Sequence, residues 1–518
     1  MTSPESTPNH PSSIRDIESL LTPEGSLYAS GDEAYQYMLF GRDSLEAADD
    51  LLESEPRLTM DVIDSLAKLQ GTEYNEATAE ETGKIPHQHM SLFVDGVRIP
   101  PKAEAQLRAL GERWGGDENG FTYYGSLDAT PQFARIMARF CFHHGASFLH
   151  EPIELENGER IARKESLRRS LRWISDHIES SELSLLEFRR LNDNHIVMQS
   201  WKDSGSAYVH TSGEQVNLDG FIAPVEVQGY GYDALKLGAL SLKEIDYISD
   251  EEANLFFECA ELLRDTTLER FWISDREGFA MAIDRDKSGN PRQVATPSSS
   301  QAALLDTRLL MDLDEGQRQQ YTGAIIERLF SPDFITEIGL RCRSAEAADL
   351  VSFADYHGSW AVWPKETYDF AKGLWRHGFN KLADDLCNRV TNMTNVAGEN
   401  YEFLFVNPNG DVDYEPKRYI PGMEVDEIII ATNVAEKCQA WTASAVLATK
   451  RKLRPQHGIA ESAWSQQLEK SILEMVPREE LLLRSEDIRS RRANARNFAI
   501  DIESGIKADK LWNPSWWT

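Results

Sequence analysis

The chain has 518 residues, enough for one large domain or several smaller ones, and its 85 Asp and Glu against 54 Lys and Arg give a formal net charge of −31. This acidic balance disfavours nucleic acids and anionic membrane surfaces as partners, and it fits a neutral or weakly charged substrate or adaptation to high salt. Five scattered cysteines form neither a disulfide framework nor a zinc pattern, which predicts a cytoplasmic protein.

We predict a disordered leader over residues 1–14, a large central domain over 15–453 and a C-terminal helical extension over 454–518. The leader is rich in Pro, Ser and Thr and lacks the basic start and apolar run of a signal peptide. No apolar stretch approaches the roughly 20 residues of a membrane span. The extension carries a basic cluster and ends in a Trp-rich stretch, Leu511–Trp517, which we expect to dock on its own domain. Docking on a partner is the alternative.

Helical periodicity dominates the central domain. Apolar or small residues recur at helical spacing in three sets: Leu167, Leu171, Ile174 and Ile178; Leu255, Cys259, Leu262 and Thr266; and Phe370, Leu374, Leu382 and Leu386. Gly378 interrupts the third set and predicts a helix end or turn. Further helices are expected near residues 44–54, 58–70, 131–147, 231–241, 320–330 and 433–450. Strand-like alternation is short and rare, as at Phe279–Ile283.

Long loops rich in aromatic, polar and Gly residues separate the helices. They cover residues 83–90, 121–130, 200–230, 351–365 and 398–415. Loops of this length in a compact domain are usually functional. We therefore expect an all-α toroid of stacked helical hairpins, with the functional site at the end where the loops gather.

Two carboxylates stand among aromatic residues in these loops. Asp203 follows Trp201 and Lys202, and Glu402 lies within Tyr401–Phe403. Hydrolysing a glycoside usually needs two such groups, one that protonates the glycosidic oxygen and one that activates water or attacks the sugar. Desolvation beside Trp can keep an acid protonated, and Lys202 would oppose this if it pointed inward, so we expect it to point elsewhere.

Other loop residues are suited to hold a sugar. Asp43 and Asp128 each precede a predicted helix, where either could be only an N-cap. The alternative is that they accept hydrogen bonds from sugar hydroxyls, with Arg42 fixing the Asp43 carboxylate. Tyr124 offers an aromatic platform on which a sugar ring can stack. For His357, a sugar-contacting or structural role is favoured over a catalytic one.

His87 and His89 could bind a metal ion together, being two residues apart. No cluster of further ligands accompanies them, and a metal site needs three or four. We therefore expect neither a metal nor a cofactor.

The ordered motifs of the chain resemble the catalytic domain of the amylo-α-1,6-glucosidase (glycogen-debranching) family over roughly residues 35–450. They read FGRDS, GKIPH, YYGSLDATP, WKDS, VEVQGYGYDAL, YHGS…VWP and QAWTASAVL. The resemblance implies an (α/α)6 barrel and an inverting hydrolase with Asp203 as general acid and Glu402 as general base. It matches sugar-pocket positions to Arg42, Asp43, Asp128, Trp201, Gln228, His357 and Trp363. From the same motifs we add Phe40, Tyr124, Tyr356 and Gly358.

Three departures from the debranching pattern favour a small substrate. Tyr401 precedes Glu402 where debranching members usually have Pro, which looks more like hydrolases of mannosylglycerate and glucosylglycerate. Trp360-Ala361 is an apparent insertion. Only Met1–Leu39 precede the first motif, where debranching members typically carry a β-rich domain. Glu399 is close enough to Glu402 to be a rival base.

The sequence thus predicts an inverting α-glucosidase-type hydrolase that cleaves an α-glucosidic or α-mannosidic bond in a small glucoside or oligosaccharide. Debranching of glycogen limit dextrin is the first alternative. An (α/α)6 epimerase or lyase that uses a His or Tyr base and a non-catalytic sugar-binding protein on the same barrel are the others. The oligomeric state and the sugar stay open.

Overall fold

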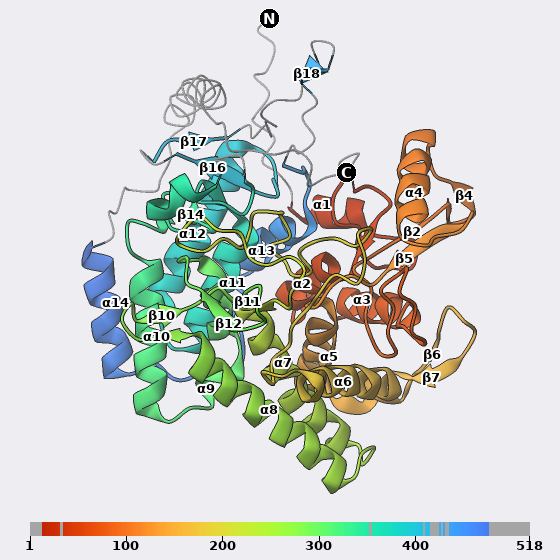
Figure 1. The fold of residues 1–518 in the computed structure, drawn as a ribbon, viewed down its shortest axis with the longest axis horizontal. Helices are drawn as coiled ribbons and strands as arrows, with labels where there is room; N and C mark the ends of the chain where they lie inside the picture. Colours follow the sequence, from red (N-terminus) through yellow and green to blue (C-terminus); the bar gives the residue numbers. More distant parts are fainter. Residues whose placement is uncertain are drawn as a thin grey trace, which may run out of the picture.

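A closed ring of helical segments forms the centre of the molecule (Figure 1). The computed structural model describes residues 13–31, 35–351, 355–407, 410–414, 424–425, 428–429 and 435–475. In ring order the inner segments are α2 (Gly41–Leu51), α5 (Ala129–His144), α7 (Val225–Glu244), the 3-10 helix η2 (Ser299–Asp306), α11 (Pro364–Arg376) and α13 (Ala440–Lys450). Each packs on the next, and α13 packs back on α2.

An outer helix covers each inner segment. The outer helices are α3 (Pro56–Lys68), α6 (Arg163–Ser180), α8 (Asp250–Phe271), α10 (Glu315–Leu329), α12 (Asn380–Ala397) and α1 (Ser13–Leu20). The first five follow their inner partners along the chain, whereas α1 packs against α13, more than 400 residues away. This is the (α/α)6 toroid of the all-α class, and the predicted fold is confirmed.

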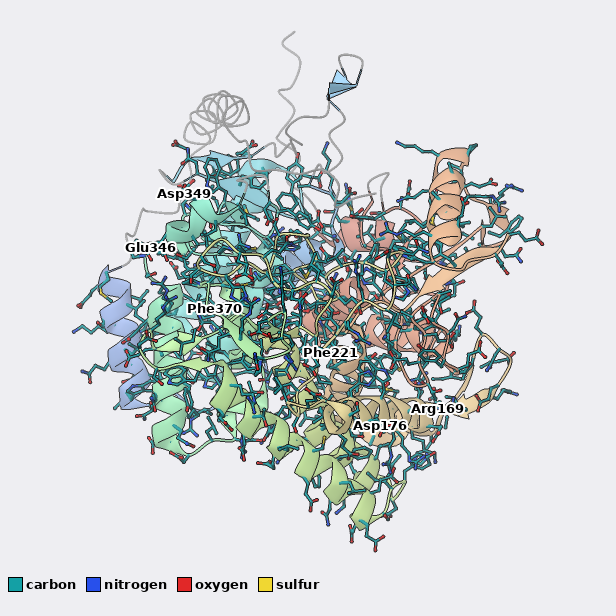
Figure 2. All side chains as sticks on the ribbon, in the orientation of Figure 1. Arg169, Asp176, Phe221, Glu346, Asp349 and Phe370 are labelled. Atoms are coloured by element: carbon teal, nitrogen blue, oxygen red, sulfur yellow. The ribbon has the colours of Figure 1, made fainter. Side chains whose placement is uncertain are left out.

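Burial follows from the two layers. The inner helix α11 is buried on every side over 364–375, whereas α6 buries one face through Leu167, Leu171, Ile174 and Ile178, as the spacing predicts. Figure 2 shows side chains filling the ring, with Phe370 of α11 among them, fully buried.

On α8 the buried face includes Cys259 of the predicted set and the residues beside it in the apolar arc. Phe256, Ala260 and Leu263 are buried, whereas Leu255 and Leu262 are 49% and 46% exposed. The apolar arc of α8 is wider than the face that its neighbours cover, so spacing alone did not identify the buried side.

Local signals fix the helix ends. The hydroxyl of Ser249 accepts a hydrogen bond from the Glu252 amide and caps α8. Gly378, with φ +78°, lies between α11 and α12, where a left-handed residue ends the first helix. The predicted break at this glycine is confirmed.

The long connections gather at one end of the toroid. Each links an outer helix to the start of the next inner segment: 69–128, 181–224, 272–298, 330–363 and 398–439. The connections at the other end are mostly short, such as 245–249 and 377–379. The prediction of long loops at one end is confirmed. The loop expected over 200–230 ends earlier, because α7 begins at Val225.

Small sheets within the long connections order them. The three-stranded sheets are β1 (Leu39–Phe40)–β2 (Gln88–Ser91)–β5 (Gly120–Tyr123), β8 (Ala223–Pro224)–β11 (Ala282–Arg285)–β12 (Pro291–Val294) and β15 (Ala361–Val362)–β16 (Leu404–Val406)–β17 (Val412–Asp413). The hairpins are β3 (Phe93–Val94)–β4 (Val97–Arg98), β6 (Pro152–Glu154)–β7 (Arg160–Ala162), β9 (Trp272–Ile273)–β10 (Gly278–Phe279), β13 (Ile335–Thr336)–β14 (Gly339–Leu340) and β18 (Glu424–Val425)–β19 (Ile428–Ile429). All pairings are antiparallel.

The remaining helices lie outside the ring pairs. They are α4 (Pro101–Arg113), η1 (Ala146–His150), α9 (Arg308–Met311), η3 (Ala345–Leu350) and α14 (Ala463–Met475). Helix α14 packs on α12 and belongs to the predicted C-terminal extension. The predicted leader up to residue 12, the basic cluster and the Trp-rich end lie outside the described residues. Among the helices that are described, none combines the length and apolar character needed to cross a membrane.

Candidate active site

Arg42 connects two of the predicted site acids. It is the second residue of α2, and its guanidinium donates to Asp128 Oδ2 at 3.0 Å and to Asp203 Oδ2 at 3.1 Å. The preceding residue is Gly41, where a Cβ atom would collide with the carbonyl of Pro86. The glycine therefore lets the 84–87 segment pack against the start of α2, beside the site.

Asp203 is the accessible member of this group. Its side chain is 28% exposed, whereas the Arg42 and Asp128 side chains are 4% and 0% exposed. The Tyr356 hydroxyl donates to Asp203 Oδ1 at 2.7 Å. Asp128 also accepts from Ser126 Oγ at 2.5 Å. The geometry gives Asp128 the role of holding Arg42, and its predicted contact with a sugar stays a prediction.

Asp43 lies beside these groups in an unfavourable setting for a charge. Burial raises its pKa, Arg42 lowers it, and Asp203 and Asp128 raise it again, which brings it to about 7. His87 is also buried close to Arg42, and burial followed by that guanidinium lowers its pKa to about 3, so the imidazole is neutral. The site therefore has three carboxylates around one guanidinium.

An aromatic cluster forms one wall of the site. The Trp201 ring meets His357 edge-on at 5.0 Å and Trp363 at 5.4 Å, and His357 stacks on Trp363 at 5.1 Å. Tyr356 stacks on Phe403 at 6.2 Å. The sequence predicted these aromatic residues to be near Asp203, with the exception of Phe403, which was noted only as a neighbour of Glu402.

Asp355 joins the Asp203 loop to the Tyr356 loop. Its Oδ1 accepts from Ser204 Oγ at 2.8 Å and from the His357 amide at 2.8 Å, and its Oδ2 accepts from Ser206 Oγ at 2.6 Å. Gly358 follows closely, and a Cβ there would lie 2.9 Å from the Asp355 carbonyl oxygen. Sequence reasoning missed Asp355, because an acid before Tyr-His carries no distinct local signal.

Lys202 points away from Asp203, as expected. Its ammonium group is fully buried and donates to Glu366 Oε1 at 3.0 Å, to Ser299 Oγ at 3.0 Å and to the Cys342 carbonyl at 3.3 Å. The side chain therefore anchors the Asp203 loop to η2 and α11. Its charge is neutralised by Glu366 below the site.

Glu402 lies where β15 and β16 bring the two predicted motifs together. Val362 pairs with Leu404, and the rings of Trp363 and Phe403 are 5.1 Å apart. Glu402 thus stands next to the aromatic wall that borders Asp203. Its Oε2 accepts from the Glu436 amide at 3.3 Å.

Glu399, the rival base, lies toward α1. Burial, Asp16 and, to a smaller extent, Glu399 raise the pKa of the Cys438 thiol. The side chain of the neighbouring Asn400 donates a hydrogen bond to Asp16 Oδ2. These contacts place Glu399 beside Cys438 and Asp16, and the choice of Glu402 as the base stays a prediction.

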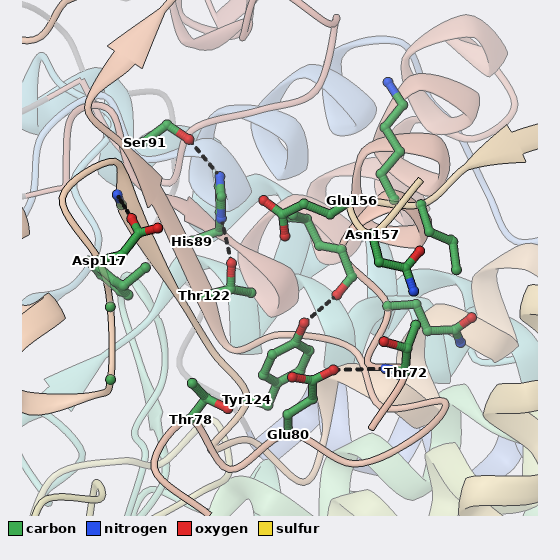
Figure 3. Close-up of a pocket in the computed structure, with 18 of the residues that line it drawn as sticks. Thr72, Thr78, Glu80, His89, Ser91, Asp117, Thr122, Tyr124, Glu156 and Asn157 are labelled. Carbon is green, nitrogen blue, oxygen red and sulfur yellow. Dashed lines mark hydrogen bonds between the residues drawn. The ribbon is translucent and has the colours of Figure 1, made fainter. Parts of the chain in front are cut away.

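Two predicted pocket residues have structural bonds. Gln228 Nε2 donates to the carbonyls of Leu186 and Pro224, each at 2.8 Å, and its Oε1 accepts from the Leu186 amide at 3.0 Å. The Tyr124 hydroxyl donates to the Leu69 carbonyl at 2.8 Å, and its ring lines a different cavity (Figure 3). Sugar contacts of these two residues stay predictions.

His87 and His89 lie on opposite sides of the β1–β2–β5 sheet. His87 meets Phe40 edge-on at 5.5 Å, near Arg42, whereas His89 lines the Tyr124 cavity. The two rings do not share a metal ion. No group of three or more His, Cys, Asp and Glu side chains in the described part of the chain is arranged to hold one.

Beneath the site, an ion network fills the axis of the toroid. Lys365 pairs with Glu46 at 3.1 Å and Asp369 at 2.8 Å, and Lys372 pairs with Asp50 at 2.7 Å and Asp369 at 2.9 Å. The network continues through Arg135, Arg139, Arg376, Asp49, Asp233 and Asp306. Among the described residues it joins five cations to six carboxylates. Burial raises the pKa of Asp49, but Arg139 and Lys372 outweigh it and bring that pKa below its usual range.

Comparison with known proteins supports the fold. No family model and no curated protein matches the sequence. Solved structures of the GH63 mannosylglycerate hydrolase from Thermus thermophilus do match. The complex with Tris has a TM-score of 0.54 at 12% identity, the complex with glucose 0.53 at 12%, and the complex with Tris and D-glycerate 0.51 at 11%. Each match covers 85% of this chain and 100% of the other. These neighbours share the (α/α)6 toroid, which defines the fold class of this chain.

Proposed function

We propose that the protein is an inverting glycoside hydrolase in which Asp203 protonates the leaving oxygen and Glu402 activates a water molecule. The observation that carries the proposal is the setting of Asp203. It is the partly exposed carboxylate of an otherwise buried group, fixed on one oxygen by Arg42 and on the other by Tyr356. The two bonds hold the carboxyl group in one orientation, and one of them must give way when Asp203 carries the proton, because both donate to its oxygens.

The surroundings suit a single sugar ring. Trp201, His357 and Trp363 form a buried aromatic wall beside Asp203, while Arg42 and Asp43 provide a donor and acceptors at the start of α2. A structural neighbour is a mannosylglycerate hydrolase that was solved with glucose. We therefore propose a small α-glucoside or α-mannoside as the substrate, with mannosylglycerate and glucosylglycerate as the first compounds to test.

The mechanism requires a specific separation of the two carboxyl groups. In inverting glycosidases they are roughly 6.5–9.5 Å apart, which leaves room for the water, whereas retaining enzymes place them about 5 Å apart. A crystal structure of the protein with a bound sugar should show the larger separation between Asp203 and Glu402. A separation near 5 Å would replace inversion by retention.

The decisive experiment is a hydrolysis panel of mannosylglycerate, glucosylglycerate, trehalose, isomaltose and glycogen limit dextrin, with NMR detection of the first anomer released. We expect turnover of a small α-linked compound and release of the β-anomer. Release of the α-anomer would contradict inversion. Cleavage of limit dextrin in preference to every small compound would instead support debranching.

A non-catalytic protein on the same toroid is tested by the same panel. Sugar binding without hydrolysis of any compound would contradict the proposed function. An epimerase or lyase would convert the sugar without adding water, and its activity would depend on His357 instead of Asp203.

A further inference from the structure

A second cavity lies outside the toroid, on the far side of the β1–β2–β5 sheet. It has a volume of about 710 Å³ and is bordered by β2, β5, the 72–80 loop, the end of α3 and residues 155–157 (Figure 3). A neighbouring cavity of about 310 Å³ shares Lys68, Leu69, His89, Ser91 and Glu156 with it. The two cavities therefore form one groove, which we call the sheet groove.

The sheet separates this groove from the candidate active site. Side chains alternate between the two faces of a strand, and directly paired residues share a face. Leu39 pairs with His89, which pairs with Thr122, and these three side chains border the groove. Phe40 lies on the opposite face, in contact with His87 beside Arg42.

Uncharged polar groups form the inner wall of the sheet groove. His89 shares hydrogen bonds with Thr122 Oγ1 at 2.8 Å and Ser91 Oγ at 3.0 Å (Figure 3). Burial lowers the pKa of His89 to about 4, so the ring is neutral near pH 7. The Tyr124 side chain adds aromatic surface to this wall.

Carboxylates stand at the edge of the groove. Glu80 Oε1 accepts from the Thr72 amide at 2.8 Å, and Asp117 Oδ1 accepts from the Asn119 amide at 2.7 Å. These bonds leave the second oxygen of each carboxylate as a further acceptor. Burial, then Glu80 and then Asp117 raise the pKa of Glu156. The edge is therefore rich in acceptors and repels anions.

We propose that the sheet groove is a second binding site for a neutral saccharide, separate from the one that holds the bond to be cleaved. Sugar hydroxyls can donate to the carboxylates at the edge and exchange hydrogen bonds with the Ser91 and Thr122 hydroxyls, while a ring face packs on Tyr124. The uncharged inner wall disfavours a polyamine, which would need charge along its length. This inference goes beyond the proposed hydrolysis and does not depend on it.

Maltotriose is the probe, and the Asp203→Asn protein is the background in which it survives a titration. Calorimetry should resolve two binding events, one at each site. Adding Thr122→Trp fills the inner wall and should weaken one event by about tenfold or more, because hydrogen bonds are lost and space is occupied. Adding Glu156→Gln should weaken the same event by a few-fold, since a charged acceptor is replaced by a neutral one.

Glu118→Lys is the matched control, because Glu118 lies beside Asp117 without lining the groove. We expect two events with unchanged affinities, and thermal unfolding verifies that every variant is folded. Absence of maltotriose binding in the Asp203→Asn protein, or equal affinities in the groove variants and the control, would overturn the proposal. Displacement of maltotriose from the groove by spermine at lower concentration would identify a cation site instead.

Hydrolysis is measured separately, so the two proposals can fail independently. Two binding events in a protein that cleaves no glycoside would support the groove proposal and contradict the proposed hydrolase function. Cleavage of a glycoside by a protein whose maltotriose binding is unchanged in the groove variants would support the hydrolase and contradict the groove.

Discussion

The mouth of the toroid and its axis hold the same kinds of charged residues in different proportions. In the mouth, Arg42 faces Asp43, Asp128 and Asp203. In the axis, the lysines and arginines of α5 and α11 nearly match the carboxylates in number among the described residues, and four of the five cations contact two or more carboxylates. The charges of the axis are closely paired, whereas the mouth has fewer cations than carboxylates among the described residues and is partly open at Asp203. Where a buried ion network has more carboxylates than cations on its solvent side, a substrate can donate hydrogen bonds to those carboxylates.

The largest expected effect concerns the exposed acid of the mouth. Asp203→Asn keeps the size of the side chain but removes the transferable proton, so kcat should fall roughly 10³–10⁴-fold. Glu402→Gln should lose a similar factor because water is no longer activated. Steady-state kinetics measure both losses, and urea unfolding should match the wild type. Wild-type kcat in either variant would exclude that residue.

Removing a cation from the ion network of the axis should lower the stability of the fold. Lys372→Met leaves Asp50 and Asp369 without their shared cation and should lower the free energy of unfolding by about 3–5 kcal/mol. Urea unfolding measures the difference. Lys381→Met is the control, because that side chain is 69% exposed and should change stability by less than about 1 kcal/mol. Equal effects of the two variants would contradict the distinction between paired axis and surface.

Asp43 in the mouth and Asp49 in the axis should respond oppositely to pH. The folded-state pKa of Asp43 is about 7, above its usual range, so the folded protein retains a proton that the unfolded chain releases, and stability falls as pH rises from 4 to 7. Asp43→Asn removes this penalty and should gain on the order of 2 kcal/mol relative to the wild type between pH 4 and pH 8.

Asp49 is the matched position in the axis. Its folded-state pKa is lowered, so its contribution to stability is present above the unfolded pKa near 4 and is lost as pH falls further. Asp49→Asn should therefore destabilise at pH 7, with a smaller penalty at pH 3. Urea unfolding at several pH values measures both variants, and parallel pH profiles would contradict the comparison.

The smallest effect is expected at the junction of the two site loops. Asp355→Asn replaces one of the oxygens that bind Ser204, Ser206 and His357, so the loops are positioned less well and kcat should fall about tenfold with little change in KM. Asp349→Asn, on the exposed surface of the same connection, should leave kcat unchanged (Figure 2). A changed KM with normal kcat would point to substrate binding at Asp355 instead.

The sequence predicted what depends on local pattern. The α6 stripe from Leu167 to Ile178 and the break at Gly378 follow from helical spacing and from the conformational freedom of glycine. The grouping of Arg42, Asp128, Asp203 and Tyr356 needed an ordered set of motifs, since the residues are up to 314 positions apart in the chain. The structure brings them together through hydrogen bonds that no single motif indicates.

Other features depend on tertiary packing and were not predicted. Gln228 shares a motif with α7, but the bonds of its amide to Leu186 and Pro224 depend on how the 181–224 connection folds back. Tyr124 belongs to a motif next to Asp128, yet its ring lines the sheet groove and not the candidate active site. The fourth inner segment is a 3-10 helix, and nothing in its spacing distinguishes it from an α-helix.

The pairing of α1 with α13 has a consequence for how the protein matures. Ser30 Oγ donates to Glu436 Oε2 at 2.9 Å, and the Glu436 amide donates to the carboxylate of Glu402. Ser30 is thus linked to the candidate base Glu402 through Glu436, which is more than 400 positions further along the chain than Ser30. During synthesis the ring stays open until α13 leaves the ribosome, and contacts at such sequence separation form slowly. The appearance of activity would then report the last folding event, the closure of the ring.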